Sequence, residues 1–510
     1  AVELTTPART TLAVDGDWNE ILAPHMRANL EAALPAYIAA QRWFATRTSI
    51  KSARIIADVA MPVDSDKVAL AIIVTELVEH EPEQYLVPIA FASGPAAAEI
   101  ELHSPGAVIA RLHSGEAGEG ILYDATASPA FWEALLELLG RRRTIRGDEG
   151  ELESLPAAGP RPGRDEGGEP VRLRNDDRNA SMSFGERFII KLLRKVEPGV
   201  HPELEAARFL AARAFPHVPP FAGVLEYKSE SGDSTCLALL SQFIPNAKNG
   251  WTFTLDALKR YFDRIRTLPE ETLAALPLGG SLLDRTQTEL PEALADLLGT
   301  YYESVQLLGR RTAELHLVLA SDPDNKDFAP EPFTPFYQRS LYQSFRNHLL
   351  QQLPVLHRQL KTLPEEARAL GERVIAAQSA ILARYRAVHE TSLSAMRIRC
   401  HGDFHLNQVL HTGKDFVVID FEGEAFRPMS ERRIKRSPLR DVAQMMRSFS
   451  YAAHAALLQQ LEGGTLQVEQ FRAMEPWVRF WLRWISAAYL RSYMAALGDS
   501  SLVPHARHEL

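Results

Sequence analysis

The residues best suited to chemistry lie together between His401 and Glu424, in the stretch HGDFHLNQVLHTGKDFVVIDFEGE. This stretch places an acid, an amide and a second acid in a fixed order, at Asp403, Gln408 and Asp420. Carboxylate and amide oxygens are the ligands that hard cations such as Mg²⁺ prefer. A phosphoryl-transfer site also needs one carboxylate that does not bind metal, to accept the proton of an attacking hydroxyl. The stretch therefore predicts a kinase active site.

Local secondary structure should bring these groups to a common point. The segment HTGKD between the two acids is typical of a turn, and FVVID is an apolar, β-branched run that ends on Asp420. A loop, a turn and a strand would then hold the two carboxylates and the amide.

A second set of residues upstream has the order found in protein kinases. Lys191 follows an apolar run, FII, that predicts a strand. A lysine in such a run is more often an edge or surface residue. Here, however, it follows a loop of small and polar residues that includes Ser183, and it precedes a predicted helix that carries Glu203 and Glu205. Protein kinases hold ATP with a loop, a strand lysine and a helix glutamate in this order. The loop alone is a weak signal because Gly185 is its one glycine.

Composition excludes several classes of protein. The 510 residues are 46% hydrophobic and 24% charged, as in ordinary globular proteins, and could form two or three domains. A net charge of −9 argues against nucleic-acid binding, which needs a basic face. Cys236 and Cys400 are too few and too far apart for a disulfide framework or a cysteine metal site, so we expect a cytoplasmic protein. Neither a signal peptide nor a bilayer-length apolar run is evident, so no membrane association is expected.

Hydrophobic periodicity indicates how the chain is organised. A helix is predicted over 21–42, followed by three strands between 51 and 93 and a helix that begins at Pro129. Residues 156–170 contain eight Gly or Pro, so a flexible loop is predicted over 146–170. After the strand that ends at Gln242 and Ile244, where a connector between kinase lobes would lie, the chain becomes largely helical.

The last helical region, 475–496, is rich in aromatic residues. At helical spacing such residues are mostly core. His316, in the amphipathic segment 301–321, is interpreted as a packed or capping histidine.

HGDFHLNQVL followed by VVIDFEG resembles the aminoglycoside phosphotransferase and choline kinase superfamily of eukaryotic-like kinases. Gln408 stands where most members have Asn. Bacterial maltokinases share that glutamine, and they resemble this chain further in DFEGEAFRPMSERR, SPLRDVAQMMRS, LGRRTAELH, PNAKNGW and QRWFA. The resemblance covers nearly the whole chain. It implies a bilobal α+β kinase fold of the aminoglycoside phosphotransferase type, with an N-terminal cap subdomain and a mainly helical C-lobe. The expected divisions are a lead-in over 1–20, the cap over 21–90, the rest of the N-lobe over 91–245 and the C-lobe over 246–510.

The resemblance also implies the reaction, which is ATP-dependent, Mg²⁺-dependent phosphorylation of maltose at its anomeric hydroxyl to give maltose 1-phosphate, in trehalose and α-glucan metabolism. Asp403 would be the catalytic base, and Gln408 and Asp420 the metal ligands. Lys191 would hold the phosphates, paired with Glu205 in preference to Glu203. The remaining candidates are Ser183, Gln242 and Ile244 for the nucleotide, and His405, Glu422, Arg427, Trp481, Tyr489 and Tyr493 for the sugar.

Several alternatives stay open. Glu422 and Glu424 could touch metal or sugar, or merely pair with Arg427 and Arg432. A related kinase of glucosamine or an aminoglycoside would want carboxylates around its cationic acceptor, and a catalytically silent sugar-binding or partner-binding module would not turn over ATP. Some maltokinases are fused to trehalose synthase. The Ala start and the extended first residues fit an excised half of such a fusion, so trehalose synthase is an expected partner.

Overall fold

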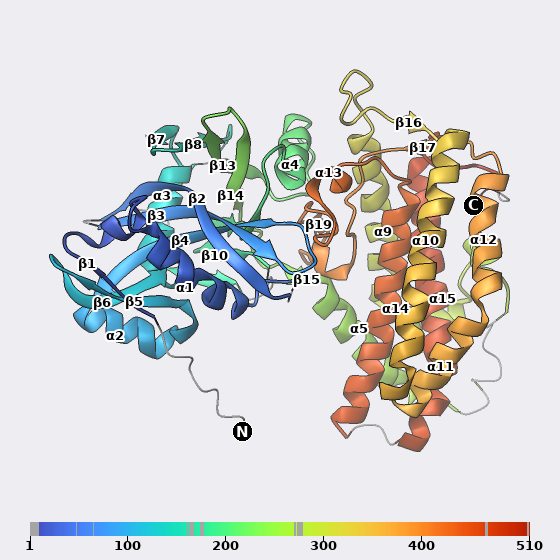
Figure 1. The fold of residues 1–510 in the computed structure, drawn as a ribbon. Coiled ribbons are helices and arrows are strands. Elements are labelled where there is room, and N and C mark those ends of the chain that lie inside the picture. Colours follow the sequence, from blue (N-terminus) through green and yellow to red (C-terminus); the bar gives the residue numbers. More distant parts are fainter. Residues whose placement is uncertain are drawn as a thin grey trace. The chain divides into compact units, whose positions relative to one another are not determined.

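The computed structural model describes residues 10–46, 48–64, 66–159, 161–162, 168–173, 178–269, 272, 279–464, 468–506 and 509. The chain divides into two compact units, Ala1–Ala247 and Lys248–Leu510. In Figure 1 the first unit runs from blue to green and the second from green to red. The second unit begins at 248, against the expected 246.

The first unit contains two sheets, of which the N-terminal one forms the cap. The short strand β12 (Lys195–Val196) also joins this sheet by pairing with β4 (Glu83–Ser93). In spatial order the other strands of the cap sheet are β1 (Thr11–Val14), β5 (Val108–Ser114), β6 (Gly118–Asp124), β4 (Glu83–Ser93), β3 (Asp66–Leu77) and β2 (Ile50–Val63). The three strands predicted between 51 and 93 are confirmed as β2, β3 and β4.

The second sheet carries Lys191 and is antiparallel throughout. Its strand order is β7 (Arg143–Arg146), β8 (Gly150–Pro156), β13 (Phe221–Ser229), β14 (Ser234–Gln242), β11 (Phe188–Leu192), β10 (Ala180–Phe184) and β9 (Pro170–Leu173). The short strand β12 (Lys195–Val196) follows β11 directly and leaves this sheet for the cap sheet.

Helices cover both faces of the cap sheet, which explains why its strands are so apolar. On one face, α1 (Arg27–Ala39) packs Leu30, Leu34 and Ile38 at helical spacing into a core with β2 to β6. On the other face, α3 (Pro129–Leu139) and the second sheet share a larger core with the cap strands. The remaining helices of this unit are α2 (Gly94–His103) and α4 (Pro202–Ala212).

Three expectations about the first unit are wrong in detail. A cap boundary at residue 90 falls inside β4, because the cap sheet continues to Asp124 at the end of β6. The predicted flexible loop 146–170 contains β8, whose Leu152 is buried against β13; residues 160 and 163–167 lie outside the described part. The predicted loop of small and polar residues around Ser183 is largely strand β10, and residues 185–187 form the turn between β10 and β11; residues 174–177 lie outside the described part.

The second unit is mainly helical, as predicted (Figure 1). A three-stranded sheet of β15 (Lys248–Asn249), β18 (Val409–His411) and β19 (Phe416–Val418) carries the HTGKD turn. A two-stranded sheet pairs β16 (Glu331–Pro332) with β17 (Met396–Arg397). The helices are α5 (Gly250–Ile265), α7 (Leu282–Thr286), α8 (Glu292–Leu298), α9 (Thr300–Leu319), α10 (Pro335–Gln359), α11 (Glu365–Ala376), α12 (Gln378–Glu390), α13 (Met429–Arg432), α14 (Leu439–Glu462) and α15 (Val468–Leu497).

Packing between α9, α14 and α15 forms the centre of the helical unit, since the buried aromatic residues of α15 lie against α9 and α14. Among the described residues, no helix combines the length and apolar character needed to cross a bilayer.

Candidate active site

Helix α14 determines the shape of the loop that carries Asp403. The carboxylate of Asp441 accepts hydrogen bonds from the backbone N–H groups of His401 (2.8 Å) and Gly402 (3.0 Å). Gly402 has a φ of +88°, a left-handed conformation that side chains rarely adopt and that glycine allows. Asp441 therefore fixes the backbone directly before the proposed base.

Two further polar side chains on the same face of α14 continue this pattern. Gln444 accepts from the N–H of Phe404 at 3.1 Å, and Ser448 accepts from the N–H of Leu406 at 3.1 Å. Residues three and four apart lie on one face of a helix, so this face presents a row of acceptors to the loop. The loop keeps its shape although it has no regular secondary structure of its own around Asp403.

Asp441 is itself held from the other side by α9. It is fully buried, and Nε2 of His316 donates to its Oδ2 at 3.0 Å, while the hydroxyl of Tyr493 bonds Nδ1 of His316 at 3.0 Å. Burial raises the pKa of Asp441, but the bonds from His316 and the loop N–H groups outweigh it and hold the pKa below its usual range. His316 is confirmed as a packed residue, and Tyr493 supports it.

His401 is a neutral hydrogen-bonding residue. Its Nε2 lies 2.9 Å from the carbonyl oxygen of Ile419, and since a carbonyl only accepts, Nε2 carries the proton. Burial lowers the pKa of His401, although Asp441 and neighbouring groups oppose this. The bond ties the loop to the end of β19, next to Asp420.

Gln408 and Asp420 are direct neighbours, as the spacing predicts. The amide Nε2 of buried Gln408 donates to Asp420 Oδ2 at 2.9 Å, which orients the carboxylate. Asp420 has a φ of +66°, and such a conformation costs a non-glycine residue about 1–3 kcal/mol, often at functional sites. The donor role of the nitrogen leaves the amide oxygen of Gln408 for a cation. Two oxygen-bearing side chains of this kind fit Mg²⁺.

Asp403 lies at a pocket of about 280 Å³ within the second unit. His405 lies next to it, with Nε2 3.7 Å from Asp403 Oδ2. The other lining residues are Trp251, Asn407, Gln444, Arg447, Ser448, Tyr451 and Ala455. Of the predicted sugar-binding residues, His405 alone is among them.

Trp251 reaches this pocket because the start of α5 lies against the catalytic loop. A side chain at Gly250 would come within 2.7 Å of the carbonyl oxygen of Leu406, so only glycine allows this approach. Asn249 caps α5 by accepting from the N–H of Trp251 at 2.9 Å, and it donates to the carbonyl of Asn407 at 3.3 Å.

In the first unit, Lys191 pairs with Glu203, and the preference for Glu205 is corrected. Lys191 Nζ lies 2.8 Å from Glu203 Oε2, and both side chains are mostly buried. Two residues along a helix correspond to a rotation of about 200° around its axis, so Glu203 and Glu205 lie on nearly opposite faces and meet different neighbours. The sequence pattern identified the helix correctly but not the face.

The other nucleotide candidates also lie on strands of the second sheet or just beyond it. Ser183 is buried in β10 and donates its hydroxyl to the carbonyl of Val171 at 3.2 Å. Gln242 ends β14, opposite Phe188 of β11, and Ile244 follows, half-buried. Their roles in nucleotide binding stay predictions.

The acceptor roles predicted for the aromatic residues of α15 are wrong. Trp481 is 1% exposed, and Tyr489 and Tyr493 are 0% exposed. Trp481 stacks on Tyr301 of α9, and Tyr489 donates to Thr312 of the same helix at 3.0 Å. These rings form the core between α9, α14 and α15 and cannot touch a sugar.

Arg427 and the nearby acids form ion pairs. Arg427 contacts Glu424 at 2.5 Å and Glu431 at 3.0 Å, and Glu424 also contacts Arg440 at 2.6 Å. Burial raises the pKa of Glu424, but both arginines outweigh it and keep the pKa low. Glu422 is buried. Neither Arg427 nor Glu422 is among the residues that line the pocket beside Asp403, and their roles at the acceptor stay predictions. Carboxylate oxygens of Glu422 and Asp420 lie within 4.8 Å of each other, so both could face one cation.

Comparisons with known proteins agree with this architecture. Residues 37–127 match the maltokinase N-terminal cap domain, and residues 170–477, more than half of the chain, match the phosphotransferase enzyme family. The chain belongs to the phosphotransferase enzyme family. The two matches together support a kinase of the maltokinase type.

Similar curated proteins are called glucosamine kinases. One, from Mycolicibacterium smegmatis, is 26% identical over 55% of this chain and 58% of its own length, so this match spans little more than half of the relative. Another, from Streptacidiphilus jiangxiensis, is 25% identical over 72% of this chain and 76% of its own length.

Solved structures share the fold of this kinase. A glucosamine kinase in complex with glucosamine, ADP and inorganic phosphate has a TM-score of 0.53 at 19% identity and covers 95% of this chain and 88% of that one. A second crystal form has a TM-score of 0.55 and covers 94% and 88%.

Sequence patterns missed Trp251, Arg447 and Tyr451 in this kinase. Arg447 and Tyr451 lie in the segment SPLRDVAQMMRS and just after it, one turn apart on the α14 face that also carries Gln444 and Ser448. That four-residue spacing beside a helix-start acid was the available signal. Trp251 could be suspected only from PNAKNGW.

His401 should make the stability of the second unit depend on pH. Its pKa is lower in the folded chain than the ordinary value near 6.5, so the unfolded state takes up the proton first. The free energy of unfolding should therefore fall as pH drops below about 6.5, by up to about 1.4 kcal/mol per pH unit. Urea unfolding from pH 7.5 to 5.5 should show a shallower slope for His401→Gln. The exposed His454 gives a control, since His454→Gln should keep the wild-type slope; an unchanged slope in His401→Gln contradicts this assignment.

Truncating Trp481 should test its place in the core. Trp481→Ala should lower the free energy of unfolding by about 3–5 kcal/mol, because a large buried ring leaves a cavity. Tyr451→Ala, on α14 and 61% exposed, should change it by less than about 0.5 kcal/mol. Both are measured by urea unfolding. A Trp481→Ala protein with wild-type stability would contradict the core assignment.

Proposed function

We propose that this protein transfers the γ-phosphoryl group of ATP to the anomeric hydroxyl of maltose, giving maltose 1-phosphate. The observation that carries the proposal is the pocket beside Asp403, whose lining offers two aromatic rings and a cation. Trp251 and Tyr451 supply surfaces on which the apolar face of a sugar ring can stack. Asn407, Gln444 and Ser448 supply polar groups for sugar hydroxyls.

Asp403 is the proposed general base. Its carboxylate lies at the pocket, on a loop that α14 holds in shape, so an acceptor hydroxyl bound there would meet a fixed carboxylate. An ordinary carboxylate suffices for phosphoryl transfer, because the acceptor proton leaves late in a loose transition state. The neighbouring His405 can hydrogen-bond Asp403 or the sugar.

Gln408 and Asp420 would hold Mg²⁺, which neutralises charge on the transferred phosphoryl group when bound. Lys191, kept in place by Glu203, is proposed to bind the α- and β-phosphates of ATP. Ser183, Gln242 and Ile244 stay candidates for the rest of the nucleotide.

Glucosamine is the second candidate acceptor, because the similar curated proteins are called glucosamine kinases. The charge of the pocket favours a neutral sugar instead. Asp403 is the one carboxylate among its lining residues, and Arg447 places a positive charge there. The ammonium group of glucosamine would be repelled by Arg447 and would compete for the proposed base.

The identity of the product tests the proposed function. Incubation with Mg²⁺-ATP and a panel of maltose, glucose, trehalose and glucosamine, followed by ³¹P NMR, should give a sugar 1-phosphate signal with maltose. A 6-phosphate formed from glucosamine, with no product from maltose, would replace the proposal by the second candidate. Binding of sugar without turnover of ATP would indicate a silent module.

Asp403→Asn should separate chemistry from binding. We expect kcat to fall by about 10²–10⁴-fold, the usual contribution of a placed general base, while Mg²⁺-ATP affinity by calorimetry stays near wild type. Asp420→Ala should instead abolish Mg²⁺-dependent nucleotide binding. Near-wild-type maltose-dependent turnover in Asp403→Asn would exclude Asp403 as the base.

The pocket variants should change acceptor recognition. Trp251→Ala should raise KM for maltose about tenfold through loss of aromatic contact, with little change in KM for ATP. Arg447→Glu should raise KM for maltose and lower KM for glucosamine, because it reverses the charge beside the acceptor. Steady-state kinetics with each sugar measure both effects. Phe336→Ala, on α10 and 82% exposed, is the control and should change neither KM; an equal effect there would show that the pocket is not the acceptor site.

A further inference from the structure

The two members of the Lys191–Glu203 ion pair stand on either side of a segment that belongs to the cap. After Lys191 the chain leaves β11, passes Arg194 and forms β12, which pairs Lys195 with Tyr85 and Val196 with Gln84 of β4. It then turns into α4, whose first turn carries Glu203. Lys191 is held in the second sheet between β10 and β14, and the segment runs from its strand through the cap sheet to the helix that carries Glu203.

Arg194 is the deepest anchor of the segment in the cap. Its Nη2 lies 2.8 Å from Asp124 Oδ2 and donates to Thr126 Oγ1 at 2.7 Å, and both charged side chains are 3% exposed. The guanidinium also lies 5.3 Å from the ring centroid of Trp43, and the backbone of Arg194 accepts from the N–H of Leu86 at 2.8 Å.

The carboxylate that receives Arg194 is fully engaged by the cap. Tyr37 on α1 donates its hydroxyl to Asp124 Oδ2 at 2.7 Å, and Thr126 donates its N–H and its hydroxyl to Oδ1 at 3.0 and 2.7 Å. The carboxylate of this pair has donors on both oxygens, whereas Nε of Arg194 is buried without a hydrogen-bond partner among the described residues. A buried charge whose counter-charge is held in one geometry resists displacement.

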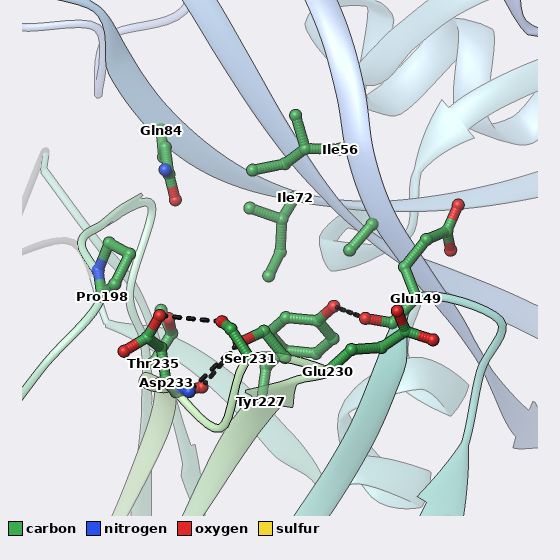
Figure 2. Close-up of a pocket in the computed structure, with 12 residues that line it drawn as sticks. Ile56, Ile72, Gln84, Glu149, Pro198, Tyr227, Glu230, Ser231, Asp233 and Thr235 are labelled. Carbon is green, nitrogen blue, oxygen red and sulfur yellow. Dashed lines mark hydrogen bonds between the residues drawn. The ribbon is translucent and has the colours of Figure 1, made fainter.

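A hollow lies between the cap strands and Pro198, although Leu193 and Val196 are buried in the core that the cap shares with the second sheet. The hollow, of about 330 Å³, is bordered by Ile56, Ile72 and Gln84 of the cap strands. Pro198, just before α4, borders it too, and Figure 2 shows Gln84 and Pro198 on one side with Tyr227 and Glu149 across the hollow. Arg194, the pairing of β12 with β4 and the buried side chains of Leu193 and Val196 therefore connect the segment to the cap.

We propose that Arg194 is a positioning residue, through which the cap sheet fixes the Lys191–Glu203 ion pair for nucleotide binding. The proposal rests on the proposed function, since it uses Lys191 as a phosphate-binding residue. The cap then contributes to nucleotide binding by positioning Lys191 and Glu203, without contacting the nucleotide.

If Arg194 only stabilised the fold, its loss would lower stability in the same way as the loss of another ion pair in this unit. A matched control is available for this comparison. Arg27 on α1 pairs with Asp58 at 2.8 Å and with Glu149, next to β8, at 3.2 Å. It also joins the cap to the second sheet, but it does not lie between Lys191 and Glu203. Loss of this pair should lower the stability of the protein without changing its affinity for the nucleotide.

The test compares Arg194→Met/Asp124→Asn, which removes both buried charges, with Arg27→Met/Asp58→Asn. Arg194→Lys keeps the charge and serves as the conservative variant if the double variant does not fold. Calorimetry should show Mg²⁺-ATP affinity about tenfold weaker in the Arg194 double variant, within the usual range of coupling between sites, and partly restored in Arg194→Lys. KM for maltose should stay within about twofold of wild type. The Arg27 variant should bind Mg²⁺-ATP like wild type even where its melting temperature falls.

A readout without nucleotide keeps this proposal separate from the proposed function. Amide hydrogen exchange over 197–205 and acylation of Lys191 should be faster in the Arg194 double variant and unchanged in the Arg27 variant. Unchanged exchange, acylation and nucleotide affinity in a folded Arg194 variant overturn the proposal. An equal loss of affinity in the Arg27 variant also overturns it. A wild-type protein that binds Mg²⁺-ATP but forms no maltose 1-phosphate would overturn the proposed function and leave the positioning result valid.

Discussion

The buried carboxylate of Asp441 is the constraint on which the catalytic unit depends. It accepts hydrogen bonds from two consecutive backbone N–H groups of the HGD loop and from His316. An ionised carboxylate is costly to bury unless each oxygen has donors, and here both have them. The arrangement links three distant segments, α9, the loop and α14, through one side chain. Asp441 thus holds the backbone next to Asp403 in place, although no catalytic step is proposed for Asp441 itself.

The same constraint explains why the late aromatic residues cannot bind sugar. His316 needs a partner on its second nitrogen, and Tyr493 supplies it from α15. Helix α15 must therefore pack closely on α9, which buries Trp481 and Tyr489 as well. The proposed sugar-binding surface lies instead at the start of α5 and on the exposed turns of α14. Aromatic spacing on a helix indicates one face of that helix, but not which neighbour the face will meet.

Much of the fold and the chemical centre could be predicted from sequence. The motif from His401 to Glu424 predicted the contact between Gln408 and Asp420, and the β-branched runs predicted β2, β3 and β4, because these features depend on residues close in the chain. Glu205 was preferred to Glu203 because two glutamates share one helical turn, and only tertiary packing selects between them. Trp251 and Arg447 were missed because they lie almost 200 residues apart and meet only in the fold. Local sequence patterns identify the proposed catalytic residues. The proposed acceptor site is formed by residues that are far apart in the sequence, and local patterns do not identify it.

The central claim is that a neutral sugar binds beside Asp403 with its anomeric hydroxyl facing that carboxylate. A crystal structure with maltose, Mg²⁺ and a non-hydrolysable ATP analogue tests it most directly. We expect the anomeric oxygen about 2.6–3.2 Å from Asp403, the reach of a general base, with a sugar ring against Trp251 or Tyr451. Maltose bound away from Asp403, or with another hydroxyl facing it, would exclude this binding mode.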